Sequence, residues 1–500
     1  MERNKIGTNA LTLTAAKIIT LLIGMVSSML LSRFRTLEEY GTYSQILLVI
    51  SLATSFFMLG LPNSTNYFLG RSESHEERQN FLSVYYTLNT CMCFLMGIAL
   101  AIAVPLIETY FHNEHIRDFI YILAVLPWTK VIINSISNVL VVYGKTKKLA
   151  LFNATNAMVA VIAIVIVKLF NWSFQVYMLL YLLGESTMML WVYFIVSKLE
   201  PPFRPMLDGR IIKSVFKFSI PIGLASLVGT LTLECDKLVI GKLMDTETLA
   251  IYTNAAKELP FTIIATSLTA VLLPQMARRM KENKTKEAIE LWKITVELSY
   301  LFIAFAVTAL IVYAPQIMTI LYSEKYLPGV GVFRVYSAVL LLRITNFGMM
   351  LNASGRTKLI LYSSIITLIV NIVLDYILYQ IIGILGPAIA TLISIFAAGF
   401  VQLIATSRLI GVPLTAVFPW KRIILHSGIN IAWGSAIYLL LKVFNVGVSG
   451  REIICCVLSG AFVAALYLLI ERKCIVKLWR TINAGGSNHT EIQQLNGQEG

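Results

Sequence analysis

The sequence is poor in charge and in cysteine, and both shortages narrow what the chain can be. Charged residues make up only 14% of its 500 residues, whereas a soluble domain averages about 25%. Its six cysteines form no Cys-x-x-Cys motif, and most fall within or beside apolar stretches. Neither a disulfide framework nor a metal site is therefore expected. A soluble globular domain is excluded, and no cofactor is predicted.

Sequence motifs typical of soluble enzymes are also missing. Gly144 precedes Lys and Thr as at the end of a phosphate-binding loop, but Val139 stands where that motif needs glycine. His112 and His115 lack the spacing of a zinc-protease helix. The longest predicted outer loops, residues 105–118 and 314–329, are too short for a catalytic domain. The sequence therefore predicts a protein that is not an enzyme.

Apolar residues dominate instead. They make up 57% of the chain, and the mean hydropathy is +0.75. A bilayer core of about 30 Å requires about 20 apolar residues per helix, because no backbone group can stay unpaired there. The sequence predicts an all-α polytopic membrane protein with 14 transmembrane helices. These lie at residues 8–32, 43–70, 81–104, 119–143, 149–168, 175–197, 218–243, 250–275, 288–313, 330–353, 358–380, 385–407, 422–441 and 452–471.

Short motifs recur about 210 residues later in the chain, which indicates an internal duplication. Pro-Leu-Ile-Glu-Thr at 105–109 returns as Pro-Gln-Ile-Met-Thr at 315–319, and Gly-Lys-Thr-Lys at 144–147 returns as Gly-Arg-Thr-Lys at 355–358. Each copy holds an even number of helices, so both enter the membrane in the same direction. We expect two parallel six-helix lobes that face a central cleft. The predicted divisions are lobes at 1–210 and 211–410, an extra helix pair at 411–471, and a disordered cytoplasmic tail at 472–500.

The net charge of +14 reflects how the loops are distributed between the two sides of the membrane. If the amino terminus is cytoplasmic, most Lys and Arg outside the helices fall on the inner side, as the positive-inside rule requires. The loop at 198–217 and the segment at 278–286 are the richest in cations. We therefore predict a multi-pass membrane protein with both termini in the cytoplasm. No concentrated basic face suggests binding of nucleic acid.

Four charged residues lie deep within predicted helices, namely Lys17, Lys130, Glu185 and Arg343. An ion at the bilayer centre costs about 2.5 to 3.5 kcal/mol on insertion scales, so such residues face water or a partner. We predict that they line a wet cleft. A structural ion pair, in particular between Lys130 and Glu185, is the alternative.

Other polar residues form stripes at helical spacing. Asn63 and Asn66 share one predicted helix, and Asn134 lies in another. Lys257 and Glu258 are placed near the outer end of a helix, where local pairing suffices.

Several segments together resemble the polysaccharide transporter family, the O-antigen-type flippases of the multidrug/oligosaccharidyl-lipid/polysaccharide superfamily. The likeness covers residues 1 to 470. The segments are Arg-Thr-Leu-Glu-Glu-Tyr-Gly-Thr-Tyr at 35–43, Asp-Lys-Leu-Val-Ile-Gly at 236–241, Tyr-Ser-Glu-Lys-Tyr-Leu-Pro at 322–328 and Asn-Ile-Val-Leu-Asp-Tyr at 371–376. Asp375 stands where this family often has asparagine.

The resemblance implies a flippase that moves polyprenyl-diphosphate-linked oligosaccharide across the bacterial cytoplasmic membrane by alternating access, for O-antigen, lipopolysaccharide or capsule synthesis. Antiport of protons or sodium ions is implied as the energy source. Implied partners are the lipid-linked substrate, membrane lipids, a polysaccharide polymerase and chain-length proteins, and a monomer is expected to suffice. A multidrug cation antiporter of the same superfamily and a flippase for peptidoglycan precursors remain alternatives.

The residues can be assigned to this function as a hypothesis. Cations in a cleft of low dielectric constant attract a diphosphate, and asparagine side chains offer hydrogen bonds to sugar hydroxyls. Intramembrane carboxylates are candidates for binding the coupling ion. The predicted substrate-binding residues are Lys17, Lys130, Arg343, Asn63, Asn66 and Asn134, and the predicted ion-coupling residues are Glu185, Asp375 and Glu234.

Overall fold

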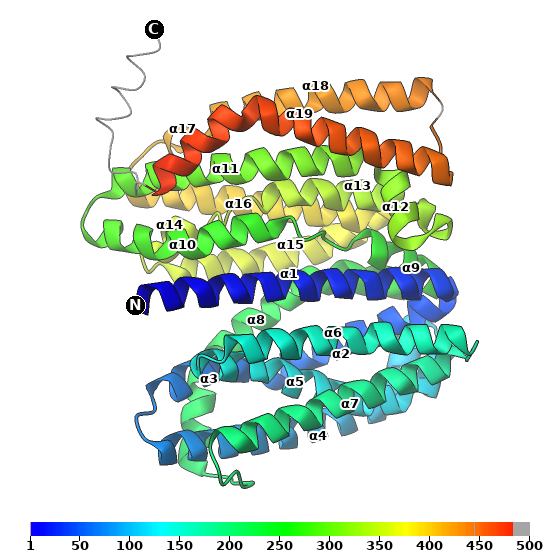
Figure 1. The fold of residues 1–500 in the computed structure, drawn as a ribbon, viewed down its shortest axis with the longest axis vertical. Coiled ribbons are helices and arrows are strands. Elements are labelled where there is room, and N and C mark those ends of the chain that lie inside the picture. Colours follow the sequence, from blue (N-terminus) through cyan, green and yellow to red (C-terminus); the bar gives the residue numbers. More distant parts are fainter. Residues whose placement is uncertain (1, 445, 484–500) are drawn as a thin grey trace. The chain divides into compact units, whose positions relative to one another are not determined.

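The computed structural model describes residues 2–444 and 446–483, without the side chains of 2–16, 264, 270, 271 and 479–483. Every regular element among these residues is a helix, which confirms the all-α membrane class (Figure 1). Of the described segments, 13 are long and apolar enough to cross a membrane. The remaining predicted span, residues 250–275, is occupied by α9 (Thr246–Ala255) and α10 (Thr262–Lys281).

The chain divides into two compact units, Met1–Thr253 and Asn254–Gly500. The division falls later than the lobe boundary predicted from the repeat at residue 210. The physical reason is α8 (Gly209–Leu243), which packs against three helices of the first unit. The boundary of the duplication itself stays a prediction.

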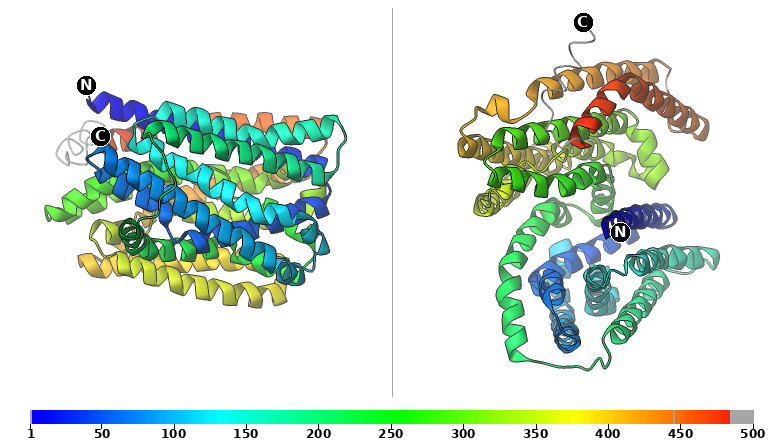
Figure 2. Two further views of the ribbon diagram at one scale, coloured as in Figure 1. Left: turned by 90° about the horizontal axis from the view of Figure 1, so that it is seen from below. Right: turned by 60° about the vertical axis from the view of Figure 1, so that its left-hand side comes forward.

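The first unit is a bundle of long helices, and many of its contacts join helices that are distant in the sequence. The most extensive of these are between α1 and α6 and between α5 and α7 (Figure 2). The unit contains α1 (Glu2–Phe34), α2 (Leu37–Met58), α3 (Leu61–Arg71), α4 (His75–Phe111), η1 (Glu114–Phe119), α5 (Ile120–Val142), α6 (Thr146–Leu169), α7 (Phe174–Leu199), α8 and most of α9.

The second unit places the two helices beyond the duplication, α18 and α19, against α11. Its most extensive packing is between α15 and α16. The unit contains α10, α11 (Thr285–Val312), α12 (Ala314–Tyr322), η2 (Glu324–Gly329), α13 (Val330–Val339), η3 (Leu340–Leu342), α14 (Met349–Ala353), α15 (Thr357–Ile382), α16 (Leu385–Ile410), α17 (Leu414–Val417), α18 (Trp420–Val443) and α19 (Gly450–Asn483).

The second predicted span, residues 43–70, is interrupted between α2 and α3. Leu59 and Gly60 adopt positive φ angles of 41° and 75°, a conformation that suits glycine. The interruption packs closely on α8, where a Cβ built on Gly60 would lie 2.6 Å from the backbone nitrogen of Gly223. Two glycines thus allow the turn and α8 to touch.

Two further interruptions occur in the second unit. The chain leaves the helix between α9 and α10, after Ala255, and again between η3 and α14, after Leu342. The continuous helices predicted at 250–275 and 330–353 are therefore wrong in detail. Interrupted helices expose backbone polar groups, which a membrane protein tolerates only where protein or water can satisfy them.

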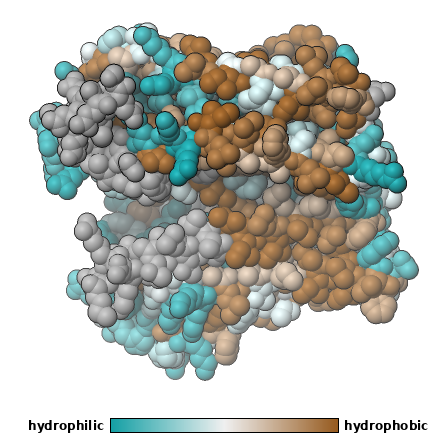
Figure 3. Space-filling view, turned by 45° about the horizontal axis from the view of Figure 1, so that its top comes forward, coloured by the Kyte–Doolittle hydropathy of each residue, from teal (hydrophilic) through white to brown (hydrophobic). Residues whose placement is uncertain are grey.

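Large apolar side chains cover much of the surface, as expected for helices that face lipid. Exposed examples include Ile102 at 75% and Val443 at 77% of their full accessible area. On the face in Figure 3, apolar residues occupy the middle and hydrophilic ones gather toward the edges. This pattern agrees with a multi-pass membrane protein.

The last helix is longer than predicted. Residues 472–483, assigned to a disordered tail, continue α19 to Asn483. Apolar residues recur at Ile475, Val476 and Leu478, so the helical pattern does not stop at the end of the predicted span. The rest of the predicted tail lies outside the described residues.

Candidate functional site

An ion pair lies inside the first unit. The Lys130 ammonium on α5 lies 2.9 Å from a carboxylate oxygen of Glu185 on α7. It also donates a 2.7 Å hydrogen bond to the Tyr181 hydroxyl. The Glu185 side chain is 3% exposed and that of Lys130 is 29% exposed. The structure thus contains the pairing that the sequence offered as an alternative, and most of the Lys130 charge is compensated.

Tyrosines surround this pair. Tyr177, Tyr181 and Glu185 follow at four-residue spacing, which places them on one face of α7. The rings of Tyr177 and Tyr181 stack with centroids 6.1 Å apart, and Tyr43 of α2 lies 6.4 Å from Tyr177. The sequence reasoning missed this cluster, although the four-residue spacing was a usable signal.

The three predicted sugar-binding asparagines are all exposed on neighbouring helices of the first unit. Asn63 and Asn66 lie on α3, and Asn134 lies on α5, which packs against α3. Asn138, one turn after Asn134, accepts a 3.4 Å hydrogen bond from Asn66 and donates to the carbonyl of Pro62. We call these four residues the asparagine patch. Uncharged amides grouped on a helix surface offer several donors and acceptors to a polar ligand.

Lys17 lies on α1, and its side chain is exposed. It joins no ion pair with another described residue. Lys130, the other predicted substrate-binding lysine of this unit, is paired with Glu185. An unpaired ammonium on a membrane helix retains all three donors for a ligand.

Arg343 lies in the second unit, at the interruption that follows η3. Its guanidinium lies 3.2 Å from the Glu258 carboxylate, which belongs to the interruption between α9 and α10. Both side chains are about one-third exposed, at 33% and 29%. The Nε of Arg343 is buried without a hydrogen-bond partner among the described residues.

The pairing with Arg343 corrects the expectation that Glu258 pairs with Lys257 at the outer end of a helix. Lys257 and Glu258 both lie outside regular helix, in the interruption between α9 and α10. The fold brings this interruption to the one that follows η3, which adjacency in the sequence could not reveal.

Asp375 lies on α15 and is fully buried, with 0% of its surface exposed. Its carboxylate accepts a 3.0 Å hydrogen bond from the Asn371 amide, one turn earlier. The adjacent antiparallel helix α16 carries Thr391 and Ser394, whose buried hydroxyl oxygens have no partner among the described residues. These four side chains place oxygen ligands, the type that alkali and alkaline-earth ions prefer, on one packed helix pair.

Glu234, the third predicted ion-coupling residue, lies on α8. Its carboxylate is 2.7 Å from the Lys237 ammonium, and both side chains are partly buried. The neighbouring Asp236 is buried and accepts a 2.9 Å hydrogen bond from the Tyr252 hydroxyl. Glu234 and Glu185 therefore both have a lysine partner within their own unit.

The long apolar helices define a multi-pass membrane protein. A family profile described as "Polysaccharide biosynthesis protein" matches residues 30–331. The chain belongs to this family of polysaccharide biosynthesis proteins, which confirms the resemblance found in the sequence. A comparison with curated proteins gave no match.

Solved structures share the fold at low sequence identity. The chain is similar to "Lipid II flippase MurJ, inward closed conformation", with a TM-score of 0.73, 16% identity and coverage of 93% of this chain and 99% of that one. It is also similar to an inward-facing multidrug resistance MATE family transporter of the MOP superfamily, with a TM-score of 0.63, 16% identity and coverage of 78% and 94%.

A third similar structure is a MOP superfamily transporter from Pyrococcus furiosus, with a TM-score of 0.54, 15% identity and coverage of 81% and 95%. These likenesses show the fold, which this chain shares with the lipid II flippase and the MATE transporters. The chain is therefore a multi-pass membrane protein of the polysaccharide biosynthesis family.

Proposed function

We propose that the protein flips a polyprenyl-diphosphate-linked oligosaccharide across the cytoplasmic membrane by alternating access, driven by an ion gradient. The glycan would enter surface polysaccharide such as O-antigen, lipopolysaccharide or capsule. Family membership supports the pathway, and the likeness to a lipid II flippase and to MATE transporters supports the mechanism class.

The observation that carries this proposal is the asparagine patch. Lipid cannot satisfy exposed amides, so such a surface on membrane helices is expected to meet water or a polar ligand. Sugar hydroxyls donate and accept hydrogen bonds, as amides do. By the predicted topology, α3 ends and α5 ends on the cytoplasmic side, where a newly made lipid-linked glycan is available.

The diphosphate would contact cations. Arg343 suits this role because guanidinium binds phosphate oxygens through two parallel hydrogen bonds, and its buried Nε donor is unused. The ligand would compete with Glu258 for this guanidinium. Lys17 would add a second positive charge. Lys130 is assigned a supporting role, since Glu185 already compensates it.

Ion coupling is assigned to Asp375. Glu185 and Glu234 each have a lysine partner that a cation would have to displace. Asp375 is buried on α15 and accepts a hydrogen bond from Asn371, and the helix packed against α15, α16, carries the hydroxyls of Thr391 and Ser394. Sodium ions and protons both fit such a site. Imposing a gradient of one ion at a time shows which of them drives transport. A polymerase and chain-length proteins are proposed as pathway partners, with the monomer as the working unit.

The proposal is tested in proteoliposomes that contain the purified protein and a lipid-linked oligosaccharide. Arrival of glycan at the outer leaflet is measured with an external lectin. We expect protein-dependent exposure that falls at least tenfold in the variant N63A/N66A/N134A, since each lost hydrogen bond contributes about 1 kcal/mol. Thr155→Ala, at an exposed position of α6, is the control and keeps full activity.

Two alternatives make different predictions in the same vesicles. A multidrug antiporter would accumulate an organic cation and leave the oligosaccharide in place. A peptidoglycan precursor flippase would expose that precursor in preference to other glycans. Either result, with no exposure of lipid-linked oligosaccharide, contradicts the proposal.

A further inference from the structure

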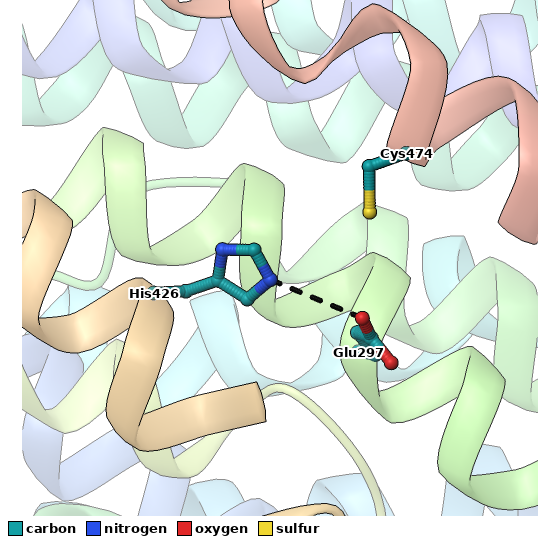
Figure 4. Close-up of side chains that lie close together, drawn as sticks. All are labelled: Glu297, His426 and Cys474. Atoms are coloured by element: carbon teal, nitrogen blue, oxygen red, sulfur yellow. Dashed lines mark ion pairs between the residues drawn. The ribbon is translucent and has the colours of Figure 1, made fainter. Parts of the chain in front are cut away.

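Three residues that are far apart in the sequence meet inside the second unit. Glu297 lies near the middle of α11, His426 near the start of α18, and Cys474 toward the end of α19. One ligand atom from each lies within 4.8 Å of the others. Figure 4 shows the carboxylate, the imidazole and the thiol grouped between the three helices. By the predicted topology, α18 begins and α19 ends on the cytoplasmic side, so His426 and Cys474 lie toward that side.

His426 is the centre of the group. It is only 4% exposed, and neither ring nitrogen has a hydrogen-bond partner among the described residues. Its Nε2 lies 3.9 Å from Glu297, and its Nδ1 lies 3.7 Å from Glu471 on α19. Both distances exceed those of hydrogen bonds. A buried imidazole with two unused nitrogen atoms is costly unless something binds it.

Carboxylates lie on both sides of His426. Glu297 and Glu471 bring two carboxylates that are 12% and 10% exposed. Arg422 lies 3.7 Å from Glu297 and brings one positive charge from an exposed side chain. The Lys477 ammonium also acts on the Cys474 sulfur. The two carboxylates, the imidazole and the thiol therefore offer four potential ligands to a cation.

We propose that Glu297, His426 and Cys474 bind a zinc-type divalent transition-metal ion. Thiolate and imidazole select such ions over magnesium and calcium, which prefer oxygen ligands. Zinc accepts cysteine, histidine and carboxylate together in tetrahedral geometry, with water or a second carboxylate oxygen as the fourth ligand.

Glu471 completes the arrangement. A metal-binding histidine usually donates its other ring N–H to a carboxylate, which fixes the tautomer and the orientation of the ring. Here Nε2 faces Glu297 and Nδ1 faces Glu471. Small shifts of these side chains bring Nδ1 into hydrogen-bond range and Nε2 toward the metal. Glu471 is therefore a positioning residue.

The site gives a role to the two helices outside the duplication. The metal would join α18 and α19 to α11, a helix of the second repeat. Binding energy of a structural metal contributes to folding because the ligands are far apart in the unfolded chain. We infer that metal occupancy fixes the extra helix pair to the second unit.

The competing occupant is a proton. An imidazolium between Glu297 and Glu471 would also bring positive charge to the two carboxylates, but it would need no thiol. Cys474 therefore distinguishes the two, and a measurement that reports sulfur coordination decides between them.

The test uses the full-length protein in detergent, reduced, stripped of metal with a chelator and titrated with cobalt(II). Cobalt bound to thiolate absorbs in the near ultraviolet through charge transfer from sulfur. We expect saturation at about one equivalent, as for a single closed site, and displacement by zinc. Cys474→Ser abolishes the band, whereas Cys455→Ser, at an exposed position on the same helix, keeps it.

Two further variants keep the test decisive if Cys474→Ser fails to fold. Cys474→His retains a metal ligand, so it should bind cobalt with tetrahedral d–d absorption but without the sulfur band. Glu471→Gln should weaken binding about 10-fold to 100-fold, as expected for a partner of the ligating histidine. A wild-type protein that shows no sulfur band, or the same band in Cys474→Ser, would overturn the proposal.

Discussion

The ion pair between Lys130 and Glu185 allows a prediction in which the two partners are not equivalent. Glu185 is almost fully enclosed at 3% exposure, whereas Lys130 is 29% exposed and also contacts the Tyr181 hydroxyl. Lys130→Ala leaves a carboxylate with no cation in an enclosed site. Glu185→Gln leaves an ammonium that can still reach water and a phenol oxygen.

The expected magnitudes follow from this difference. Removing one partner of a buried pair costs about 3 to 5 kcal/mol, and Lys130→Ala should lie in this range. Glu185→Gln preserves the shape of the side chain and leaves only a partly exposed cation without its counter-charge. We therefore expect a loss of about 1 kcal/mol in the free energy of unfolding. The exchange K130E/E185K should be more stable than Lys130→Ala because it restores opposite charges.

Thermal unfolding of the purified protein in detergent, followed by tryptophan fluorescence, measures the order of stability. Lys148→Ala, at an exposed position on α6, serves as the control and should unfold like the wild type. The reasoning is refuted if Glu185→Gln unfolds at a lower temperature than Lys130→Ala. In the lectin assay the exchange variant should regain transport, since Lys130 is assigned a supporting role. Restored stability without transport would instead place Lys130 in contact with substrate.

Three other predictions test the remaining assignments. Arg343→Lys keeps the charge but loses the planar fork, so lectin-detected flipping should fall at least about tenfold, since a hydrogen bond to a charged group contributes about 1.5 to 3 kcal/mol; unchanged flipping would remove Arg343 from the phosphate site. Asp375→Asn should abolish the dependence of flipping on an imposed sodium or proton gradient while protein abundance stays normal, and a gradient response equal to the wild type would contradict this. Gly223→Leu should destabilise the fold by about 1 to 3 kcal/mol through overpacking against the α2–α3 turn, seen as a lower unfolding temperature, whereas Gly229→Ala on the same helix meets no atom within 4 Å and should have little effect.

The number and type of the helices could be predicted from sequence because one-dimensional hydropathy reports burial in lipid directly. The interruptions were harder to predict, although Gly60 before Pro62, and Pro260 near the second interruption, are recognised breaking signals. The interruption after Leu342 has no such residue before Gly348. It is stabilised by tertiary contacts, among them the ion pair of Arg343 with Glu258, which composition does not encode.

The chemical types in the candidate sites were predictable, but most of their partners were not. Lys130 and Glu185 were weighed as a pair because both are charged and deep, whereas Glu258 was assigned to its sequence neighbour. The group of Glu297, His426 and Cys474 has no local spacing that would reveal it, since each residue comes from a different helix. Sites built on one helix leave a periodic signal, and sites built across helices leave none.

The first helices of the two predicted repeats, α1 and α8, differ in how their lysines are paired. In α1 the cation Lys17 is exposed and has no ion partner among the described residues, while in α8 the cation Lys237 has Glu234 three residues earlier, at 2.7 Å. Spacing of three residues places both on one helix face, so the second repeat neutralises its own lysine. A phosphate group gains most from a cation that has no carboxylate to displace. Of these two lysines, Lys17 is therefore the better candidate for the proposed contact with the diphosphate.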